Sequence, residues 1–506
     1  MSARLQPHPK YEVVIGLEVH VHLRTDSKLF SPAPVRYGNP PNHDTHPIDL
    51  GLPGVLPVLN RRVVELGVRA ALATHCKVHP QSIFARKNYF YPDLPKGYQI
   101  SQYEDPLATG GWLEVEVSGY DAPVRVGLTR IHIEEDAGKS IHDAAIAGDA
   151  GSHVDLNRAG VPLLEIVSEP DLRSPEEAAA YLRKLRELLR WADVSDADME
   201  KGQFRCDANL SLRRHGAPEL GTRTELKNLN SFRFVEEALY AEIARQAELL
   251  DRGERVVQAT MHYDPSRRTT RVMRLKENAD DYRYFPDPDL LPLLIAEADI
   301  DAVRRALPEL PEDRRARFER DYALSEYDAL LLTESRALAD FFEAAAKASA
   351  QAAAGSAQRG ETERSRGSAK SVANWMLRDV LAQLKERDCE IDATQLTPAA
   401  LAKLIALVED GRVTAASARP LVGVLVESGG DPEALVRTRG LEAVSDSGLL
   451  ESAADAAIAA HPDIVAQVCG GDAKGLNFLM GQVMKRTQGK ANPKAVREIL
   501  ARKLEA

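Results

Sequence analysis

The residues best suited to chemistry lie near the N-terminus, in the stretch from Ile15 to Arg24. Apolar side chains occupy its odd positions, and its even positions include Glu18, His20 and His22. Alternation with period two is typical of a half-buried strand, in which residues two apart point to the same face. A carboxylate and an imidazole in one row can bind a divalent ion. The same row also suits a solvated strand face, so one strand alone does not decide between the two interpretations.

Three further stretches, 129–136, 204–213 and 222–227, show strand-like alternation with one face rich in charged side chains. Glu135 is out of phase and joins the charged face of its strand only if a bulge turns it inward. Close carboxylates repel one another unless cations compensate, which favours a divalent-ion site over a solvated face. If the four strands pair, they form one polar surface that carries Glu18, His20, Glu134, Asp207 and Glu225.

Helices are predicted between these strands. Residues 60–74 have helical character, and Ser174 to Glu177 forms a capping box that opens a helix reaching about Trp191. Ser231 can cap another helix, which Gly253 can close. Strands and helices that follow no regular β-α-β order predict an α+β domain on a largely antiparallel sheet, over residues 1–295.

The composition changes after Pro292 to Ala, Leu, Glu and Arg, and the strand signal almost disappears. We expect an all-α domain over 296–430, interrupted near 348–367 by a polar, low-complexity segment that predicts a flexible insertion. A small helical tail domain is expected over 431–506. Helices are predicted in the larger domain at 298–306, 312–320, 325–347, 371–387 and 397–408.

The overall charge and the cysteines exclude several classes of protein. A net charge of −11 argues against indiscriminate coating of nucleic acid, but it allows a local basic patch. The four scattered cysteines form no C-x-x-C pair, so neither a disulfide framework nor a cysteine zinc site is indicated. No apolar run approaches the ~20 residues that cross a bilayer. We therefore expect a cytoplasmic protein that does not associate with membranes.

The P-loop, a G-x-G-x-x-G that opens a helix, the G-x-S-x-G elbow and H-E-x-x-H are absent from the sequence, and two other stretches leave alternatives open. Ala137 to Ser140 resembles the end of a P-loop, but Ile133 stands where that motif requires glycine. The loop residues His43, His46 and Asp49 have spacing that allows metal binding, although loop histidines are usually surface residues. The segment 86–103 can stack a base or grip phosphates through Lys87 and Lys96, or it can be a packed aromatic loop. An acidic sheet face that binds Mg²⁺ suits an ATP-dependent enzyme.

Long motifs in this chain resemble the B subunits of the aspartyl/glutamyl-tRNA(Asn/Gln) amidotransferase family. They run in the same order over nearly the whole chain and occupy residues 14–32, 86–103, 132–140, 155–171, 205–213, 224–232 and 478–493. Some family members carry a C-x-x-C pair where this chain has His46 and Asp49, and the segment 348–367 has no recognised counterpart.

The resemblance implies a catalytic domain akin in fold to glutamine synthetase and guanido kinases. That domain uses ATP and Mg²⁺ to phosphorylate the side-chain carboxylate of glutamate or aspartate misacylated onto tRNA(Gln) or tRNA(Asn). Ammonia released by the glutaminase, or amidase, partner then attacks, and a small third partner braces the pair. The family pattern implies that Mg²⁺ is held by Glu18, His20, Glu134 and Glu135, with Glu225 as a further candidate.

The resemblance also implies roles for residues outside the metal ligands. Lys87 and Lys96 would contact phosphate or the ammonia passage, and Asp207 is added from the strand phase. From Lys474 onward the sequence contains eight basic residues and only two acids, Glu498 and Glu505. The resemblance implies that this tail contacts tRNA through Lys485, Arg486 and Lys490.

Two alternatives stay open from the sequence. One is a small-molecule carboxylate–amine ligase of the glutamine synthetase kind, which has no need of a basic tail. The other is a tRNA-binding scaffold whose partner performs the chemistry, which the acidic surface argues against.

Overall fold

The computed structural model describes residues 7–141, 151–229, 231–275, 279–352, 361–443, 447–469, 473–487 and 491–504. The chain forms two compact units, Met1–Leu310 and Pro311–Ala506.

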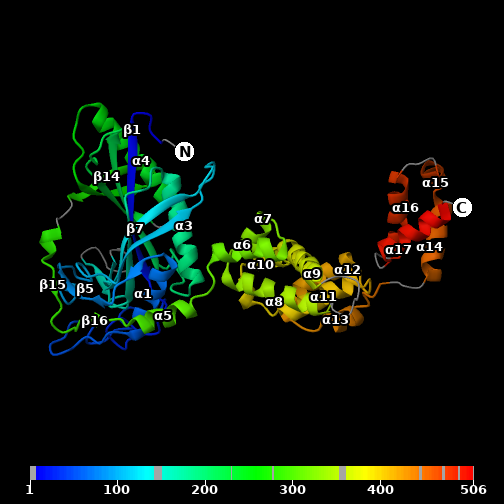
Figure 1. Ribbon diagram of the computed structural model, residues 1–506, viewed down its shortest axis with the longest axis horizontal. Coiled ribbons are helices and arrows are strands. Elements are labelled where there is room, and N and C mark those ends of the chain that lie inside the picture. The colour runs from blue at the N-terminus through cyan, green and yellow to red at the C-terminus, as the bar shows by residue number, and fades with distance from the viewer. Residues whose placement is uncertain are drawn as a thin grey trace. The chain divides into compact units, whose positions relative to one another are not determined.

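The first unit is built on one large sheet (Figure 1). Every neighbouring pair of its strands is antiparallel except β12 and β13, which are parallel. The predicted α+β class and the largely antiparallel sheet are therefore confirmed. Within the described residues the strand order is β14 (Thr269–Leu275), β13 (Ala259–Asp264), β12 (Thr224–Leu229), β11 (Phe204–Arg214), β1 (Tyr11–His22), β10 (Pro162–Ser168), β7 (Val124–Glu135), β6 (Ala108–Val115) and β2 (Lys77–Val78).

Helices α1 (Arg61–Ala73), α3 (Pro175–Trp191) and α4 (Phe232–Asp251) pack against one face of this sheet (Figure 1). The odd-numbered residues of β1 from Val13 to Val21 lie in the core that these helices share with the sheet. The helix starts agree with the predicted caps, because Ser174 and Ser231 each accept a hydrogen bond from a backbone N–H in the first turn. The opposite, even-numbered face of β1 is left for polar side chains.

Strand β10 is the principal feature that the sequence analysis missed. The four predicted strands are present as β1, β7, β11 and β12, but β10 lies between β1 and β7 and separates them. Its sequence, PLLEIVS, is nearly continuous in apolar residues, and all but one of its residues are buried. A strand covered on both faces lacks the alternation that identifies a half-exposed strand.

Short strands complete the first unit. Strands β5 (Tyr98–Ser101), β4 (Ala85–Asn88) and β15 (Phe285–Pro286) form a small sheet, β16 (Leu293–Leu294) pairs with β3 (Gln81–Ser82), and β8 (Lys139–Ile141) pairs with β9 (His153–Asp155). Helix α5 (Glu297–Ala306) packs against α1, and its Ile300 joins the same core. The first unit thus extends past the domain boundary predicted at residue 295.

Helices form the regular secondary structure of the second unit within its described residues, apart from an isolated bridge between Val413 and Glu442. The unit contains α6 (Pro311–Tyr322), α7 (Glu326–Leu332), α8 (Arg336–Ala352), α9 (Glu361–Trp375), α10 (Leu381–Arg387), α11 (Pro398–Glu409), α12 (Ala415–Ser428), α13 (Pro432–Thr438), α14 (Ser447–Ala460), α15 (Pro462–Cys469), α16 (Ala473–Arg486) and α17 (Pro493–Leu504). A π-helical turn, Met376–Val380, joins α9 to α10.

Three details of this unit differ from the sequence predictions. The single helix expected over 325–347 is divided into α7 and α8, because Thr333 ends α7. Residues 348–352 and 361–367 of the expected insertion are helical, and residues 353–360 lie outside the described ranges. Helix α13 packs on α11 and α12, whereas α14 to α17 share a separate core, so that core begins later than the tail boundary predicted at 431.

None of the helices described here combines the length and the apolar composition required to span a bilayer.

Candidate metal centre

Acidic and imidazole side chains from three neighbouring strands meet on the helix-free face of the large sheet. His20 on β1 lies directly opposite Glu165 on β10, and Glu165 lies opposite His132 on β7. Directly opposed residues in antiparallel strands point to the same face, so these three side chains form one row across the sheet. Glu18 and Glu134 lie two residues along from His20 and His132 on the same strands.

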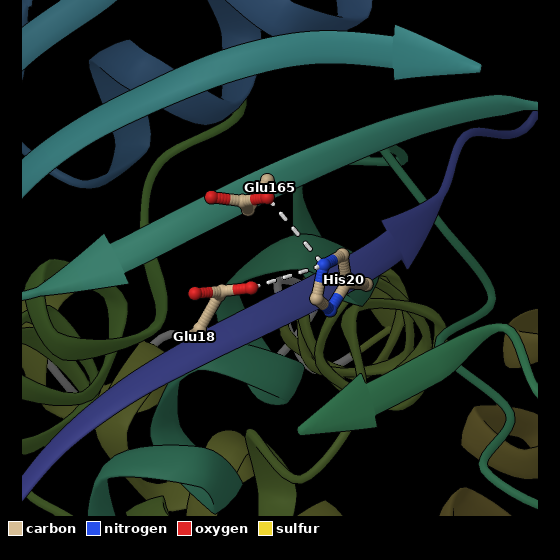
Figure 2. A group of neighbouring side chains, drawn as sticks. All are labelled: Glu18, His20 and Glu165. Carbon is tan, nitrogen blue, oxygen red and sulfur yellow. Dashed lines mark ion pairs between the residues drawn. The ribbon is translucent and has the colours of Figure 1, made fainter. Parts of the chain in front are cut away.

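The distances within this cluster are short. His20 Nε2 lies 3.5 Å from Glu18 Oε1 and 3.5 Å from Glu165 Oε2 (Figure 2). His132 Nε2 lies 3.5 Å from the same Glu165 oxygen and 3.6 Å from Glu134 Oε2. Glu165 is therefore shared by two groups that could each hold a metal ion, Glu18–His20–Glu165 and His132–Glu134–Glu165.

The donor set fits a divalent ion. Neighbouring ligands of an octahedral ion with bonds of 2.0–2.1 Å are about 3 Å apart, and the pairs at 3.5 Å are close to that spacing. The carboxylates supply the oxygen atoms that Mg²⁺ prefers, whereas imidazole nitrogen is also suited to transition metals such as Mn²⁺ or Zn²⁺.

Without an ion, the cluster holds protons. Burial alone would lower the pKa of His20, but the hydrogen bond and charge of Glu165, together with Glu18, raise it to about 9. Burial is likewise outweighed at His132, where Glu165 and Glu134 raise the pKa to about 9. The two imidazolium groups overcome the effect of burial on Glu165 and hold its pKa well below the usual range. A metal ion must therefore displace protons from the imidazoles.

Two predicted site residues, Asp207 and Glu225, lie beside the cluster and form ion pairs with the same lysine, Lys227. Asp207 on β11 lies opposite Glu18 and forms an ion pair with Lys227. Lys227 Nζ also lies 3.7 Å from Glu225 Oε1, and Thr260 donates a hydrogen bond of 3.2 Å to the other Glu225 oxygen. Asp207 and Glu225 belong to the same polar face, but neither is in the two metal-binding groups found among the described residues.

Glu135 lies on the other face of β7, because no bulge occurs at this position. The register of β7 against β10 shifts only between Val167 and Ser168, at the far end of the pairing. Glu135 forms an ion pair with Lys96 and accepts a hydrogen bond of 2.9 Å from Ile100 N. The structure thus separates Glu135 and Lys96 from the cluster, and the strand phase explains why.

Lys87, on β4, lies on the same side as the cluster. Its ammonium group lies 4.9 Å from the centre of the Tyr282 ring. Burial acts to lower the pKa of Lys87, but Tyr284 and the carboxylates of Glu134 and Glu165 outweigh it and raise that pKa. Lys87 therefore adds a positive charge within electrostatic reach of the two carboxylates.

A buried aspartate closes one end of the site. Asp136 Oδ2 lies 2.6 Å from His22 Nε2, 2.7 Å from Arg205 Nη2 and 3.4 Å from Arg158 Nε. The charges of Arg205 and Arg158, together with the contact from His22, outweigh burial and hold the pKa of Asp136 well below its usual range. His22 thus pairs with Asp136 and is not part of either metal-binding group described above. Arg205, opposite His20, is positioned by the same carboxylate.

A cavity of about 410 Å³ adjoins Glu18 on this face. Asn209 and Ser211 contribute polar groups to its wall, and Arg130 and Arg223 contribute positive charge. Arg130 also lies 3.8 Å from Glu165, which links the cavity to the cluster. A concave site of this size with cations beside an acidic cluster suits a phosphorylated ligand.

The loop histidines are arranged differently. His43 lies 2.8 Å from Asp44, whereas Asp49 pairs with the fully buried Lys28 at 3.1 Å. Within the described part of the chain, His43, His46 and Asp49 form no metal-binding group.

Comparison with known proteins decides the family. A model of the GatB/GatE catalytic domain matches residues 13–301, and a model of the GatB domain matches residues 360–504. The B subunit of aspartyl/glutamyl-tRNA(Asn/Gln) amidotransferase from Solidesulfovibrio magneticus is 50% identical over 98% of this chain and 99% of its own length. The proteins of the same name from Halorhodospira halophila and Oleidesulfovibrio alaskensis are 50% and 51% identical, again over 98% of this chain and 99% of their own. This chain belongs to the family of amidotransferase B subunits.

The family assignment confirms the resemblance seen in the sequence. It supports the tRNA amidotransferase over the small-molecule ligase, and it makes the chain part of a ligase-type amidotransferase.

In this member of the GatB family the predicted tRNA-binding residues lie in the tail. Lys485 and Arg486 are exposed in the last turn of α16, and Lys490 lies outside the described residues. Two other basic residues of the tail are paired with acids of α14. Arg502 lies 2.5 Å from Glu451, and Lys503 lies 2.6 Å from Asp455. The tail therefore presents less positive charge than its sequence suggests.

Glu165 and His132 are the site residues that the sequence analysis did not select. His132 lies on the charged face predicted for the stretch 129–136, but only the tertiary pairing reveals its contact with Glu165. Glu165 lies inside the family motif at residues 155–171, and the available signal was a single carboxylate in an otherwise apolar run. A charged residue in a fully buried strand is rare unless it is paired or binds a metal.

Proposed function

We propose that this chain activates the side-chain carboxylate of glutamate or aspartate misacylated onto tRNA(Gln) or tRNA(Asn), at the expense of ATP. The observation that carries the proposal is the cluster of Glu18, His20 and Glu165 beside a cation-lined cavity, in a chain of the GatB family. The cluster offers ligands for Mg²⁺, and the cavity offers room for the phosphates.

The chemistry has two steps. A carboxylate oxygen of the aminoacyl group takes the γ-phosphoryl group of ATP, and ADP leaves. Ammonia then attacks the acyl carbon, phosphate leaves, and the nitrogen loses a proton to give the amide. Phosphate is a far better leaving group than hydroxide, which is why the first step makes the second possible. Mg²⁺ supplies charge neutralisation between the phosphate oxygens when it is bound.

The residues of the chain have separate tasks in this proposal. Glu18, His20, Glu165 and Glu134 hold the metal, and Arg130 and Arg223 attract the phosphates from the cavity wall. Lys87 adds positive charge beside Glu134 and Glu165, at a position suited to a phosphate or to the entry of ammonia. Lys96 is held by Glu135 and keeps a structural role.

The names of the relatives imply a complex with further protein chains. We propose that a glutaminase, or amidase, partner releases ammonia from glutamine, and that a small third partner completes the assembly as a heterotrimer. The first unit acts as the catalytic domain, with kinship to the glutamine synthetase and guanido kinase fold. The helical unit and its tail hold the body of the tRNA, with Lys485 and Arg486 facing solvent for that contact.

The test is an amidation assay of the assembled complex with ATP, Mg²⁺, glutamine and each misacylated tRNA. Glu18→Gln should lower amidation by at least ~100-fold because a neutral amide is a poor ligand for Mg²⁺, and glutaminase activity should persist. Glu114→Gln is the matched control, because Glu114 is exposed on β6 of the same sheet. Near-normal amidation by the Glu18 variant would overturn the catalytic role of the cluster.

A further inference from the structure

The outer strands of the large sheet carry a basic surface that the proposed reaction does not use. It consists of Lys227 on β12, His262 on β13, Arg271 on β14, and Arg267 and Arg268 in the turn between β13 and β14. We propose that this basic surface guides the unpaired 3′-terminal strand of the aminoacylated tRNA to the metal centre. The inference rests on the proposed function and adds the route by which its substrate arrives.

The strand register aligns the surface with the cluster. Lys227 pairs with His262 across β12 and β13, and His262 pairs with Arg271 across β13 and β14. Paired residues of neighbouring strands point to the same face, so the three basic side chains form a row. The row continues through the ion pair of Lys227 with Asp207, and Asp207 lies directly opposite Glu18.

The length of the row suits several nucleotides. Arg271 and Glu18 are four strand spacings apart, because β13, β12 and β11 lie between β14 and β1. With about 4.8 Å between neighbouring strands, the row spans about 19 Å. A terminal aminoacyl group at the cluster would thus leave the preceding phosphates over β12, β13 and β14.

The charge of this region contrasts with that of the whole chain. Residues 259–273 contain three arginines and only one acid, Asp264, in a protein with a net charge of −11. The Arg267 side chain is 80% exposed and lies 4.0 Å from Asp264, and Arg268 and Arg271 are exposed as well. Exposed arginines are well suited to phosphate, which they bind with paired N–H donors.

An exposed apolar side chain accompanies the arginines. Met273 is 59% exposed on β14 at the edge of the sheet, where the pairing with β13 is irregular, whereas Val272 lies opposite the core residue Met261 and so points to the other face. Unstacked bases of a single strand can pack on such side chains while arginines contact the backbone, whereas a duplex presents mainly phosphates. The combination therefore favours a single-stranded end over a helical stem. Strand β14 is at the edge of the sheet, so a polypeptide strand could also pair with it. The positive charge of the surface favours RNA as the partner.

The experiment compares two deacylated tRNAs that differ only in their unpaired 3′-terminal nucleotides, which one of them lacks. Their affinity for the assembled complex is measured over a range of salt concentrations for wild type, Arg271→Ala and Arg267→Ala/Arg268→Ala. Arg252→Ala is the matched control, because Arg252 is exposed at the far end of α4, where it pairs with Glu248.

We expect Arg271→Ala to weaken binding of the intact tRNA by about three- to tenfold and to lower the salt slope by about 0.7, the value for one lost contact to a single strand. Binding of the shortened tRNA should not change. Equal losses for both tRNAs, no loss for either, or dissociation of the complex in place of weaker tRNA binding would overturn the inference.

Wild-type amidation separates this result from the proposed function. If the wild-type complex amidates misacylated tRNA and Arg271→Ala weakens binding of both tRNAs equally or of neither, the route is wrong and the function stands. If wild type amidates neither misacylated tRNA, the proposed function itself fails.

Discussion

Glu165 and His20 face each other across neighbouring strands β10 and β1, with 3.5 Å between Glu165 Oε2 and His20 Nε2. The same carboxylate oxygen lies 3.5 Å from His132 on the far side. One buried glutamate thus serves two imidazoles, and this shared position makes it the centre of the candidate metal site. The strand that carries it also separates the two other strands of the cluster, so the fold and the site depend on the same element.

Metal affinity is expected to rise with pH. The pKa of His20 and that of His132 are both raised to about 9, so at neutral pH each imidazole holds a proton that an ion must displace. Below that pKa, affinity should increase about tenfold per pH unit for each proton released. Calorimetric titration with Mn²⁺ at pH 7 and pH 8, in buffers of different ionisation enthalpy, measures both effects. Affinity that is independent of pH, with no proton release, would contradict the assignment of these imidazoles.

Asp136→Asn should destabilise the first unit. The neutral amide leaves Arg205 and Arg158 without their buried counter-charge, although each arginine keeps about a third of its side chain exposed and water screens it in part. We expect a loss of about 1–3 kcal/mol in the free energy of unfolding. Urea unfolding of the whole chain measures it, with the exposed Asp121→Asn as control. If the two variants are equally stable, the charges around Asp136 contribute little.

Glu343 should make the helical unit sensitive to acid. Burial opposes ionisation of Glu343, but Arg317 at 2.7 Å, Arg314 at 2.6 Å and Tyr322 lower its pKa to about 2. A lowered pKa means that the stabilisation is complete above the ordinary value of 4.5 and is lost as pH falls toward 2. Glu343→Gln should cost about 1–2 kcal/mol at pH 7 and less at pH 3.

Thermal or urea unfolding at the two pH values tests this, and the exposed Glu334→Gln serves as control. A Glu343 variant whose deficit is as large at pH 3 as at pH 7 would show that packing, rather than charge, dominates at this position.

The tail offers a matched pair of double variants for tRNA binding. Lys485→Ala/Arg486→Ala removes exposed charges, whereas Arg502→Ala/Lys503→Ala removes charges already paired with Glu451 and Asp455. The first should lower the slope of affinity against salt by about 0.9 per lost duplex contact, and the second should lower it less. Fluorescence titration of labelled tRNA at several salt concentrations gives both slopes. Equal slopes for the two variants would remove the basis for assigning Lys485 and Arg486 to tRNA.

Local patterns allowed much of the fold to be predicted. The alternation in β1 and β11 gave their buried and polar faces, and Ser174 and Ser231 marked helix starts. These features depend on residues close together in the chain, where period and capping chemistry are informative. Helix α12 was missed because Pro420 and Gly423 interrupt its pattern, although packing on its neighbours maintains it.

The site could be predicted only in part, because strand order is a tertiary property. Glu18 and His20 were found from their own strand, but the insertion of β10 between β1 and β7 brings in Glu165. The pairing of Lys227 with Asp207 likewise depends on which strands become neighbours. At Glu135 the local pattern agrees with the structure. Its out-of-phase position indicated the opposite face of β7, whereas the family pattern placed this residue at the metal.

The role of the metal centre is tested most sharply by Glu165→Gln in the assembled complex, because that residue joins both metal-binding groups. Mn²⁺ binding and ATP cleavage dependent on misacylated tRNA are measured together for wild type, Glu165→Gln and the control Glu114→Gln. We expect Glu165→Gln to lose at least ~100-fold in tRNA-dependent ATP cleavage and to bind Mn²⁺ at least ~10-fold more weakly, with glutaminase activity retained. Metal binding and ATP cleavage at the level of the Glu114 control would contradict this role of the metal centre.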